Sequence, residues 1–185
     1  MKQKPPGEVR LIGGLWKRSK LPVADRPGLR PTPDRVRETL FNWLGQALTG
    51  WRVLDAFAGS GALGFEAASR GAAEVLLIER DTVLVASLEA VKTRLAAAAV
   101  TVLRADSLSW MARAAPERYE LVLIDPPFEG GLAPAAAAVA TRLVAPGGFL
   151  YVEAAEPLAQ SPPEFTLARS LKAGAVHAQL WQRNV

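Results

Sequence analysis

The sequence of 185 residues contains no cysteine and only one histidine, His177. Without cysteine, the chain forms no disulfide, Cys-ligated zinc site or iron–sulfur cluster, and it offers no thiol nucleophile. A single histidine argues against a multi-histidine metal site and against a catalytic triad built on histidine. We therefore expect no metal, and we expect His177 to be structural.

Long apolar runs are also missing. No stretch approaches the roughly 18 residues of a membrane span, and the N-terminus has no apolar core of a signal peptide. Hydrophobic residues make up 50% and charged residues 22% of the chain, as in ordinary globular proteins. The length suggests one domain with a short appendage. We expect a cytoplasmic monomer.

The positive charge is unevenly distributed. Residues 1–30 carry a net charge of +6, whereas residues 31–185 sum to −2. A basic segment on a slightly acidic body indicates a polyanionic partner, with nucleic acid first and a membrane surface second. A solvated basic tail is the alternative.

The N-terminal third predicts a hairpin, a linker and a helix. Residues 8–23 form two short apolar runs around Gly13-Gly14, which is a hairpin turn signal. Turn-forming residues then make 24–31 a linker. Thr32 as a hydroxyl N-cap and Pro33 as the first helical residue predict an amphipathic helix that Gly50 ends.

From residue 52 onward, strands alternate with helices. Strands are predicted at 52–57, 74–79, 100–104, 119–125 and 148–153, with helices at 62–70, 82–97, 107–114 and 134–143. The runs 165–171 and 175–182 have no helix between them and predict an antiparallel pair. The pattern indicates an α/β, Rossmann-like, doubly wound, mostly parallel seven-stranded sheet with a C-terminal antiparallel hairpin and a small N-terminal β-hairpin extension.

A glycine-rich loop follows the first strand of this sheet. Gly59 to Gly64 match the pattern G-x-G-x-x-G, and Glu79 lies 20 residues after Gly59 at the end of the second strand. This spacing satisfies the dinucleotide-binding fingerprint, in which the acid binds a ribose hydroxyl. Taken alone, the loop supports an NAD(P)-dependent oxidoreductase.

S-adenosylmethionine fits the same loop better. Asp55 precedes the glycines, where a carboxylate would repel a pyrophosphate but can act on a cationic amino group. Asp106 follows the third strand and can accept from an adenine amino group. Asp55, Glu79 and Asp106 thus end successive strands, at the edge where open α/β sheets bind ligands. The alternative is a tight strand–helix turn with acids at the surface.

A second motif ends the fourth strand. In Asp125-Pro126-Pro127-Phe128 the prolines stop the sheet ladder and fix the backbone. The Asp125 carboxylate and the Pro126 carbonyl can each accept one N–H of a planar amino group, and Phe128 can stack on its ring. Orientation of this kind supplies about 7–11 kcal/mol. Asp125 is the candidate base for the proton that is lost.

The lack of cysteine also bears on the acceptor atom. Methylation of pyrimidine carbon-5 proceeds through a cysteine adduct, so nitrogen methylation is favoured. A nucleic-acid base must be flipped out or single-stranded to reach such a site. The motif does not name the base, so adenine N6 and cytosine N4 of DNA or RNA remain alternatives. A non-enzymatic RNA-binding module is a further one, but it would not require this set of acids.

Several of these segments resemble those of a known family. Asp55–Gly64 is similar to motif I of class I S-adenosylmethionine-dependent methyltransferases, and Asp125–Phe128 is similar to motif IV of their amino-methylating branch. The basic stretch Ile12–Pro22 and the segment Arg30–Asn42 are more specific. Together they resemble the bacterial RsmD family, which methylates the N2 amino group of a guanine in 16S rRNA of the small ribosomal subunit. The resemblance runs from about Val9 to Gln182.

The resemblance implies two parts of the chain with different roles. Residues 1–31 would form a basic hairpin and linker, and 32–185 a class I methyltransferase domain that acts on 16S rRNA or the assembling small subunit. The catalytic set would be Asp125, Pro126, Pro127 and Phe128. The S-adenosylmethionine site would contain Asp55, Phe57, Ala58, Gly59, Ser60, Gly61, Glu79, Arg80, Asp106 and Ser107.

The implied RNA-binding set lies in the basic N-terminal part. It comprises Arg10, Trp16, Lys17, Arg18, Lys20, Arg30, Thr32, Arg35, Arg37 and Asn42. The basic residues of the hairpin and Arg30 would contact phosphate, and Trp16 would either stack on a base or pack within the hairpin. Arg35, Arg37 and Asn42 are expected on the polar side of their helix, where a solvated face is the alternative.

Overall fold

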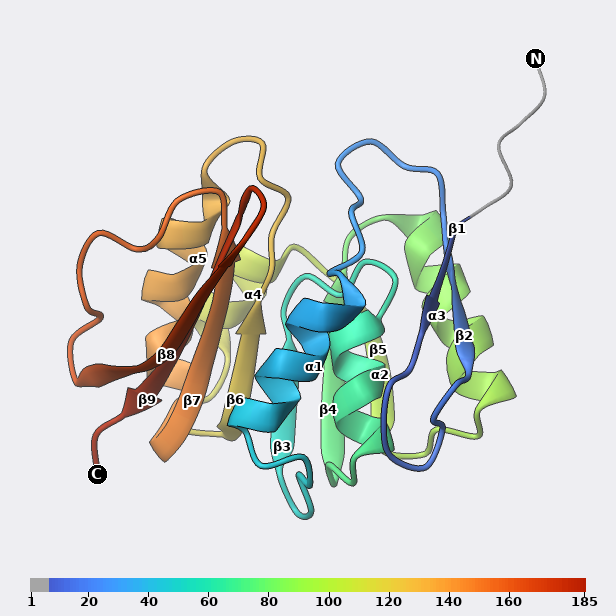
Figure 1. The fold of residues 1–185 in the computed structure, drawn as a ribbon, viewed down its shortest axis with the longest axis horizontal. Coiled ribbons are helices and arrows are strands. Elements are labelled where there is room, and N and C mark those ends of the chain that lie inside the picture. The colour runs from blue at the N-terminus through green and yellow to red at the C-terminus, as the bar shows by residue number, and fades with distance from the viewer. Residues whose placement is uncertain (1–6) are drawn as a thin grey trace.

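The computed structural model describes residues 7–185 and contains two β-sheets (Figure 1). The larger sheet has seven strands in the order β5-β4-β3-β6-β7-β9-β8. Neighbouring strands among the first five of this order are parallel, whereas β9 runs antiparallel to both β7 and β8. The predicted fold class, including the C-terminal hairpin, is confirmed.

The strands follow the apolar runs of the sequence. Their bounds are β3 (Arg52–Asp55), β4 (Glu74–Glu79), β5 (Val100–Arg104), β6 (Tyr119–Ile124), β7 (Val144–Ala154), β8 (Phe165–Ala173) and β9 (Val176–Arg183). Side chains of successive strand residues enter opposite faces. Val53 therefore belongs to one core and Leu54 to the other.

Helices cover both faces of the sheet. On one face lie α1 (Asp34–Trp43), α2 (Ala62–Ser69) and α3 (Thr82–Arg94), whose apolar residues share a core with Val53 and Leu77. On the other lie α4 (Ser107–Arg113), α5 (Leu132–Ala140) and the 3₁₀ turn η1 (Thr141–Leu143). Figure 1 shows α1 and α2 in front of the sheet and α5 behind it. This doubly wound arrangement leaves the carboxyl ends of the parallel strands open for a site.

The N-terminal strands β1 (Gly7–Arg10) and β2 (Lys20–Val23) pair antiparallel as a separate two-stranded sheet. The predicted two-residue turn at Gly13-Gly14 is wrong, because residues 11–19 form a longer loop. The amides of Ile12 and Gly13 donate to the Glu66 carboxylate at 2.9 and 2.8 Å, and the Trp16 amide donates to Ser69 Oγ at 2.9 Å. Bonds to α2 thus replace the ladder of a tight hairpin.

The start of α1 also differs from the prediction. Pro33 occupies the N-cap position without a side-chain cap, and the helix begins at Asp34. The Thr32 hydroxyl donates to Asp125 Oδ2 at 3.0 Å instead of capping the helix. The helix ends at Trp43, earlier than Gly50. Because Thr32 does not cap the helix, its hydroxyl can contact Asp125, which lies 93 residues away in the sequence.

Two further observations concern absent features. None of the helices within residues 7–185 is long and apolar enough to cross a membrane. In the same range, no three acidic or histidine side chains gather in a way that could hold a metal ion. Lys2 and Lys4, which contribute to the basic segment of the sequence, lie outside the described residues.

Candidate active site

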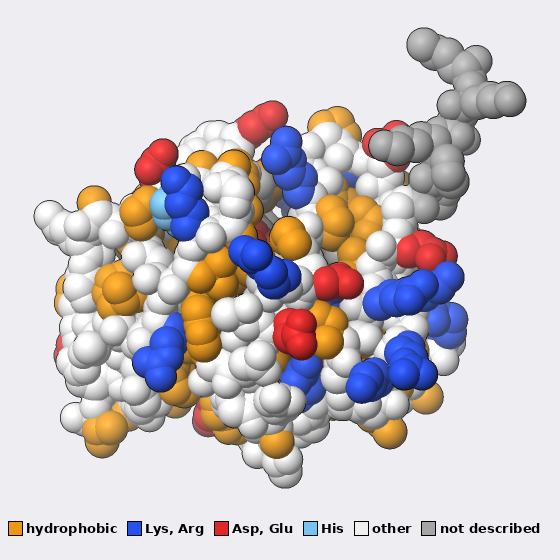
Figure 2. Space-filling view, viewed as in Figure 1, with side chains coloured by type: hydrophobic (Ala, Val, Ile, Leu, Met, Phe, Trp, Pro, Cys, Tyr) orange, Lys and Arg blue, Asp and Glu red, His pale blue; other side chains and the backbone are white. Residues whose placement is uncertain are grey.

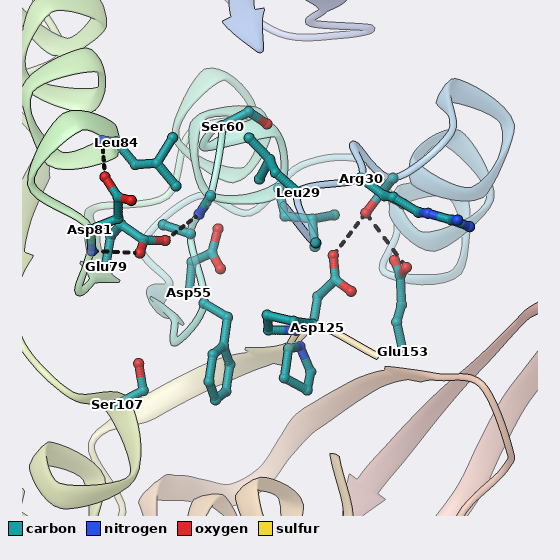
Figure 3. Close-up of a pocket in the computed structure, with 18 of the residues that line it drawn as sticks. Leu29, Arg30, Asp55, Ser60, Glu79, Asp81, Leu84, Ser107, Asp125 and Glu153 are labelled. Carbon is teal, nitrogen blue, oxygen red and sulfur yellow. Dashed lines mark hydrogen bonds between the residues drawn. The ribbon is translucent and has the colours of Figure 1, made fainter. Parts of the chain in front are cut away.

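A cavity of about 590 Å³ opens at the carboxyl edge of the sheet, where β3, β4, β5 and β6 end. The acids that end or follow these strands, Asp55, Glu79, Asp106 and Asp125, all line it. Figure 3 shows Asp55, Glu79 and Asp125. The strands β3 and β6 are neighbours in the sheet. The chain continues from β3 to β4 and β5 on one side, and from β6 to β7 on the other side. The cavity therefore lies at the topological switch point, where doubly wound sheets bind ligands.

The glycine loop shapes one wall of this cavity. Gly59 and Gly61 have φ values of +55° and +81°, which favour glycine over residues with a Cβ. Gly64 has no such φ, but a Cβ there would collide with the Leu77 side chain. Its amide donates to Asp55 Oδ2 at 3.0 Å. This bond joins the first turn of α2 to the end of β3, at a position where a Cβ has no space.

Asp55 has one carboxylate oxygen without a partner. The residue is 1% exposed, and Oδ1 is buried with no hydrogen bond to any described residue. Burial raises the pKa of Asp55 to about 7, and the backbone amides of Gly64 and Phe57 oppose that rise. A buried, unpaired acceptor is costly, so this atom fits a ligand that brings a cationic donor.

The carboxylate of Glu79 is held in place by backbone amides. Oε2 accepts from Gly59 at 3.1 Å, and Oε1 accepts from Arg80 at 2.8 Å and from Asp81 at 3.0 Å. A carboxylate has about four acceptor sites, so one remains for a further donor. That site can accept from one hydroxyl group of a ligand in the cavity.

Asp106 and Ser107 form the far side of the cavity. Asp106 caps α4 by accepting from the Ser109 amide at 2.9 Å, and this bond lowers the pKa of Asp106. The Ser107 hydroxyl donates to the Ala56 carbonyl and so ties this loop to the end of β3. Asp106 is therefore an ionised acceptor at neutral pH, suited to an exocyclic amino group.

The segment Asp125–Phe128 forms the opposite wall. All four of its residues line the cavity, and Asp125 is half-buried just beyond the end of β6. Burial and the neighbouring Glu153 raise the pKa of Asp125 well above its usual range, while the bond from Thr32 opposes the rise. The candidate acceptor of an amino group thus faces the same space as Asp55, as Figure 3 shows.

The structure adds residues that the sequence analysis missed. Glu153 on β7 lines the cavity beside Asp125, and its position at the end of a predicted buried strand was the available signal. The linker also closes over the cavity. Leu29 approaches the glycine loop at Gly59, and Arg26 forms an ion pair with Asp81 at 3.7 Å.

Most predicted cofactor and catalytic residues share this one space. Of the cofactor set, Gly61 alone is not among the lining residues. Of the RNA-binding set, Arg30 and Thr32 line the cavity, whereas the others lie away from its wall. Those residues are Arg10, Trp16, Lys17, Arg18, Lys20, Arg35, Arg37 and Asn42.

The expected position of Arg37 on the polar side of its helix is wrong. Its side chain is fully buried. Nη1 donates to the Arg10 carbonyl at 2.9 Å and lies 3.4 Å from Glu66, and Nε donates to the Thr32 carbonyl at 3.2 Å. Nη2 pairs with Asp34. Arg37 is hidden because it joins the hairpin, α1 and α2, and it is not free to meet a phosphate.

The remaining basic residues are accessible. Arg10, Lys17, Arg18, Lys20, Arg30 and Arg35 are exposed, and Lys20 pairs with Glu8 at 3.0 Å. Figure 2 shows Lys and Arg side chains gathered on the side of the molecule that carries the β1–β2 hairpin. Trp16 is half-buried and packs against the core. The hairpin therefore offers a basic surface anchored by its apolar residues.

The chain was compared with known proteins. A family model described as "Conserved hypothetical protein 95" matches residues 9–182. Ribosomal RNA small subunit methyltransferase D of Escherichia coli (strain K12) is 42% identical over 185 residues, covering 96% of this chain and 91% of the relative. The protein of that name from Haemophilus influenzae is 39% identical, with 95% and 94% covered. The solved structure of yhhF from Escherichia coli has a TM-score of 0.86 at 38% identity, with 96% and 99% covered.

Proposed function

The chain belongs to the RsmD family of methyltransferases, and we propose that it methylates the exocyclic N2 amino group of a guanine in 16S rRNA of the small ribosomal subunit, using S-adenosylmethionine. One observation carries the proposal: an unpaired buried Asp55 oxygen and the Asp125–Phe128 segment face a single cavity on adjacent strands. The names of the curated relatives support rRNA as the substrate.

The residues around the glycine loop fit S-adenosylmethionine. Asp55 Oδ1 would accept from the cationic amino group, Glu79 would take a ribose hydroxyl, and Asp106 would accept from the adenine amino group. A dinucleotide would bring a pyrophosphate toward Asp55, where two negative charges repel each other. When bound, S-adenosylmethionine supplies a methyl group on a positively charged sulfur.

The Asp125–Phe128 segment would hold the acceptor base. Asp125 and the Pro126 carbonyl would each accept one amino N–H, while Phe128 would stack on the guanine ring. This geometry fixes the direction of the nitrogen lone pair, and orientation of this kind contributes about 7–11 kcal/mol to the lowering of the barrier. Asp125 would then accept the proton that leaves the nitrogen.

The basic hairpin would bind the rRNA backbone. Arg10, Lys17, Arg18 and Lys20 present charge without belonging to the cavity wall, and Arg30 lies at its rim. Phosphate contacts of this kind position a nucleic acid but carry little sequence information. Selection of the guanine would therefore depend on the cavity.

The decisive experiment is methyl transfer from radiolabelled S-adenosylmethionine to 16S rRNA and to assembled small subunits, followed by nucleoside analysis. We expect N2-methylguanosine. Recovery of N6-methyladenosine or N4-methylcytidine would replace guanine as the substrate, and transfer to neither RNA form would overturn the proposal.

A variant pair separates chemistry from cofactor binding. Asp125→Asn is expected to lower kcat by at least about 10²-fold, because general-base catalysis contributes 10²–10⁴-fold. Its affinity for S-adenosylmethionine should stay near that of the wild type. Asp55→Asn is the matched change on the cofactor side and should weaken cofactor binding. Full activity of Asp125→Asn would remove Asp125 from this role.

A further inference from the structure

A second carboxyl group lies beside Asp125, and the proposed function gives it no role. Glu153 is on β7, which pairs in parallel with β6, and the residue is only 2% exposed. Its side chain lines the same cavity as Asp125. An acid buried this deeply next to another acid is unfavourable unless its proton or its hydrogen bonds compensate.

Hydrogen bonds connect the two acids through one hydroxyl group. Thr32 Oγ1 lies 3.0 Å from Asp125 Oδ2 and 3.5 Å from Glu153 Oε2. Tyr151 donates its hydroxyl to Glu153 Oε1 at 2.8 Å. In Figure 3, the two dashed lines that converge between Asp125 and Glu153 are those of Thr32.

The hydroxyl of Thr32 has only one hydrogen, so it can donate to one of the two acids at a time. If both acids were ionised, the other contact would bring oxygen lone pairs against each other. If one acid carries a proton, it donates to Thr32 Oγ1 while Thr32 donates to the other acid. Both contacts are then hydrogen bonds, so the arrangement is satisfied by one shared proton.

The surroundings of the pair favour that proton. Asp55 on β3 and Asp125 on β6 face Glu153 as like charges, which favours the proton. The Arg37 cation on α1 and the hydroxyls of Tyr151 on β7 and of Thr32 partly offset this effect, because they stabilise the ionised form of Glu153. His177 on β9 lies opposite Ala154, so its side chain belongs to the other face. Burial raises the pKa of Glu153 to about 7 and that of Asp125 well above its usual value.

We propose that Glu153 is a positioning residue for Asp125: through the Thr32 hydroxyl, it takes up the proton that the pair shares, so that Asp125 meets the substrate amino group as a carboxylate. This inference rests on the proposed function. The amino N–H groups would select the ionised form of Asp125, because a carboxylate accepts hydrogen bonds and a protonated acid also donates one.

The proton transfer balances without any other reactant. The Asp125 O–H proton passes to Thr32 Oγ1 as the Thr32 hydroxyl proton passes to Glu153 Oε2, so two O–H bonds break and two form. No electron is gained or lost. After methyl transfer, Asp125 accepts the proton of the amino nitrogen, and this surplus proton leaves to solvent with the product.

The first test is a titration of the protein without substrate. Carboxyl carbons of Asp and Glu are labelled with ¹³C and followed by NMR, with assignments from Glu153→Gln and Thr32→Val. We expect one carboxyl of the pair to be protonated at neutral pH. Glu153→Gln removes the like charge, so Asp125 should titrate about one pH unit or more lower. Two carboxyls that both titrate below pH 5 would overturn the proposal.

Thr32→Val is the matched variant, in which the pKa of Asp125 should change in the opposite direction. Valine keeps the size of threonine but loses the hydroxyl that lowers the pKa of Asp125. The Asp125 titration should therefore move to higher pH. If Glu153→Gln does not fold, this variant decides, and an unchanged Asp125 titration in it overturns the proposal.

The second test is the pH profile of kcat for methyl transfer to rRNA. Glutamine at 153 can still donate to Thr32 and accept from Tyr151, so Glu153→Gln should stay active, with its acidic limb moved to lower pH. Glu153→Leu should lose kcat at least about 10-fold with unchanged cofactor affinity. A folded but inactive Glu153→Gln, or an unmoved acidic limb, would overturn the role.

The two tests fail independently. If the wild-type protein transfers no methyl group to rRNA, the proposed function is wrong, whereas the NMR titration still decides whether Asp125 and Glu153 share a proton. If methyl transfer occurs but the pair shares no proton, only the role of Glu153 is wrong.

Discussion

Arg37 donates from Nε to the backbone carbonyl of Thr32 at 3.2 Å, and the Thr32 hydroxyl donates to Asp125 at 3.0 Å. The same guanidinium donates to the Arg10 carbonyl in the hairpin and lies 3.4 Å from Glu66 on α2. One buried side chain therefore links the basic hairpin to the acid that would hold the substrate amino group.

Replacing Arg37 is expected to destabilise the protein rather than to weaken phosphate binding. Arg37→Leu leaves the buried Glu66 with one cationic partner, Arg70, instead of two, and frees two backbone carbonyls. Breaking a buried pair costs about 3–5 kcal/mol, so we expect about 3 kcal/mol in urea denaturation. Arg35→Gln, on the exposed side of the same helix, should change stability by less than about 0.5 kcal/mol. Equal losses in both variants would contradict this role.

Cofactor binding is expected to strengthen with pH up to about 7. Burial raises the pKa of Asp55 to about 7, and a cationic amino group would favour its ionised form. Below that pH, binding must release a proton, so the affinity should rise by up to about tenfold per pH unit and level off above it. Calorimetry with S-adenosylmethionine at pH 5.5, 6.5 and 7.5 measures this dependence.

Two variants identify which carboxylate causes this pH dependence of cofactor affinity. Asp55→Asn should weaken binding and remove the dependence between pH 5.5 and 7.5. Asp106→Asn should weaken binding but keep the dependence, because the pKa of Asp106 is lowered and its carboxylate stays ionised throughout. A wild-type affinity that does not change over this range would argue against Asp55 as the partner of the amino group.

The missing side chain of Gly64 is expected to matter for stability. A Cβ there would collide with Leu77 and would lie 3.1 Å from Asp55 Oδ2. Overpacking of a core costs about 1–3 kcal/mol, and Gly64→Ala should lose about that much in thermal unfolding. Gly7→Ala is the control, because its Cβ would meet Val23 at an ordinary 3.7 Å. A neutral Gly64→Ala would show that α2 or the Leu77 side chain can move aside.

RNA affinity is expected to depend on salt through the hairpin. Deleting the hairpin would be a poor test, since Val9, Leu11 and Leu21 are buried in the core. The double change Lys17→Gln and Arg18→Gln removes exposed charge alone. The slope of log affinity against log salt concentration should fall by about 0.7–0.9 for each phosphate that the double variant no longer neutralises.

Fluorescence anisotropy with an rRNA fragment at several salt concentrations gives this slope. Arg113→Gln on α4, across the sheet from α1–α3, is a single-charge control and should leave the slope unchanged. If the control lowers the slope as much as the hairpin variant does, the charge acts without regard to position and the hairpin is not the binding surface.

Local sequence predicted much of the scaffold. The bounds of β4 and β5 agree with the predicted strands, because strands buried on both faces are continuous apolar runs between turns. The acids that end or follow β3, β4 and β5 were predicted at one edge of the sheet for a related reason: parallel strands place their carboxyl ends at one edge. In the structure they line one cavity.

Other features were beyond local reasoning. Thr32 matched the pattern of a helix N-cap, Arg37 that of a solvated helix face, and Gly13-Gly14 that of a tight turn. In each case a side chain or backbone group found a partner far along the chain: Thr32 bonds to Asp125 and Glu153, 93 and 121 residues away, and Gly13 bonds to Glu66.

The sequence by itself therefore determined the fold class, the order of the strands along the chain and the edge at which the acids gather. Tertiary structure alone decided that Thr32 bridges Asp125 and the buried Glu153 and that Arg37 is hidden. The physical reason is that apolar patterning is repeated locally along each element, whereas a buried polar group is satisfied by whichever donor or acceptor the packed elements bring next to it.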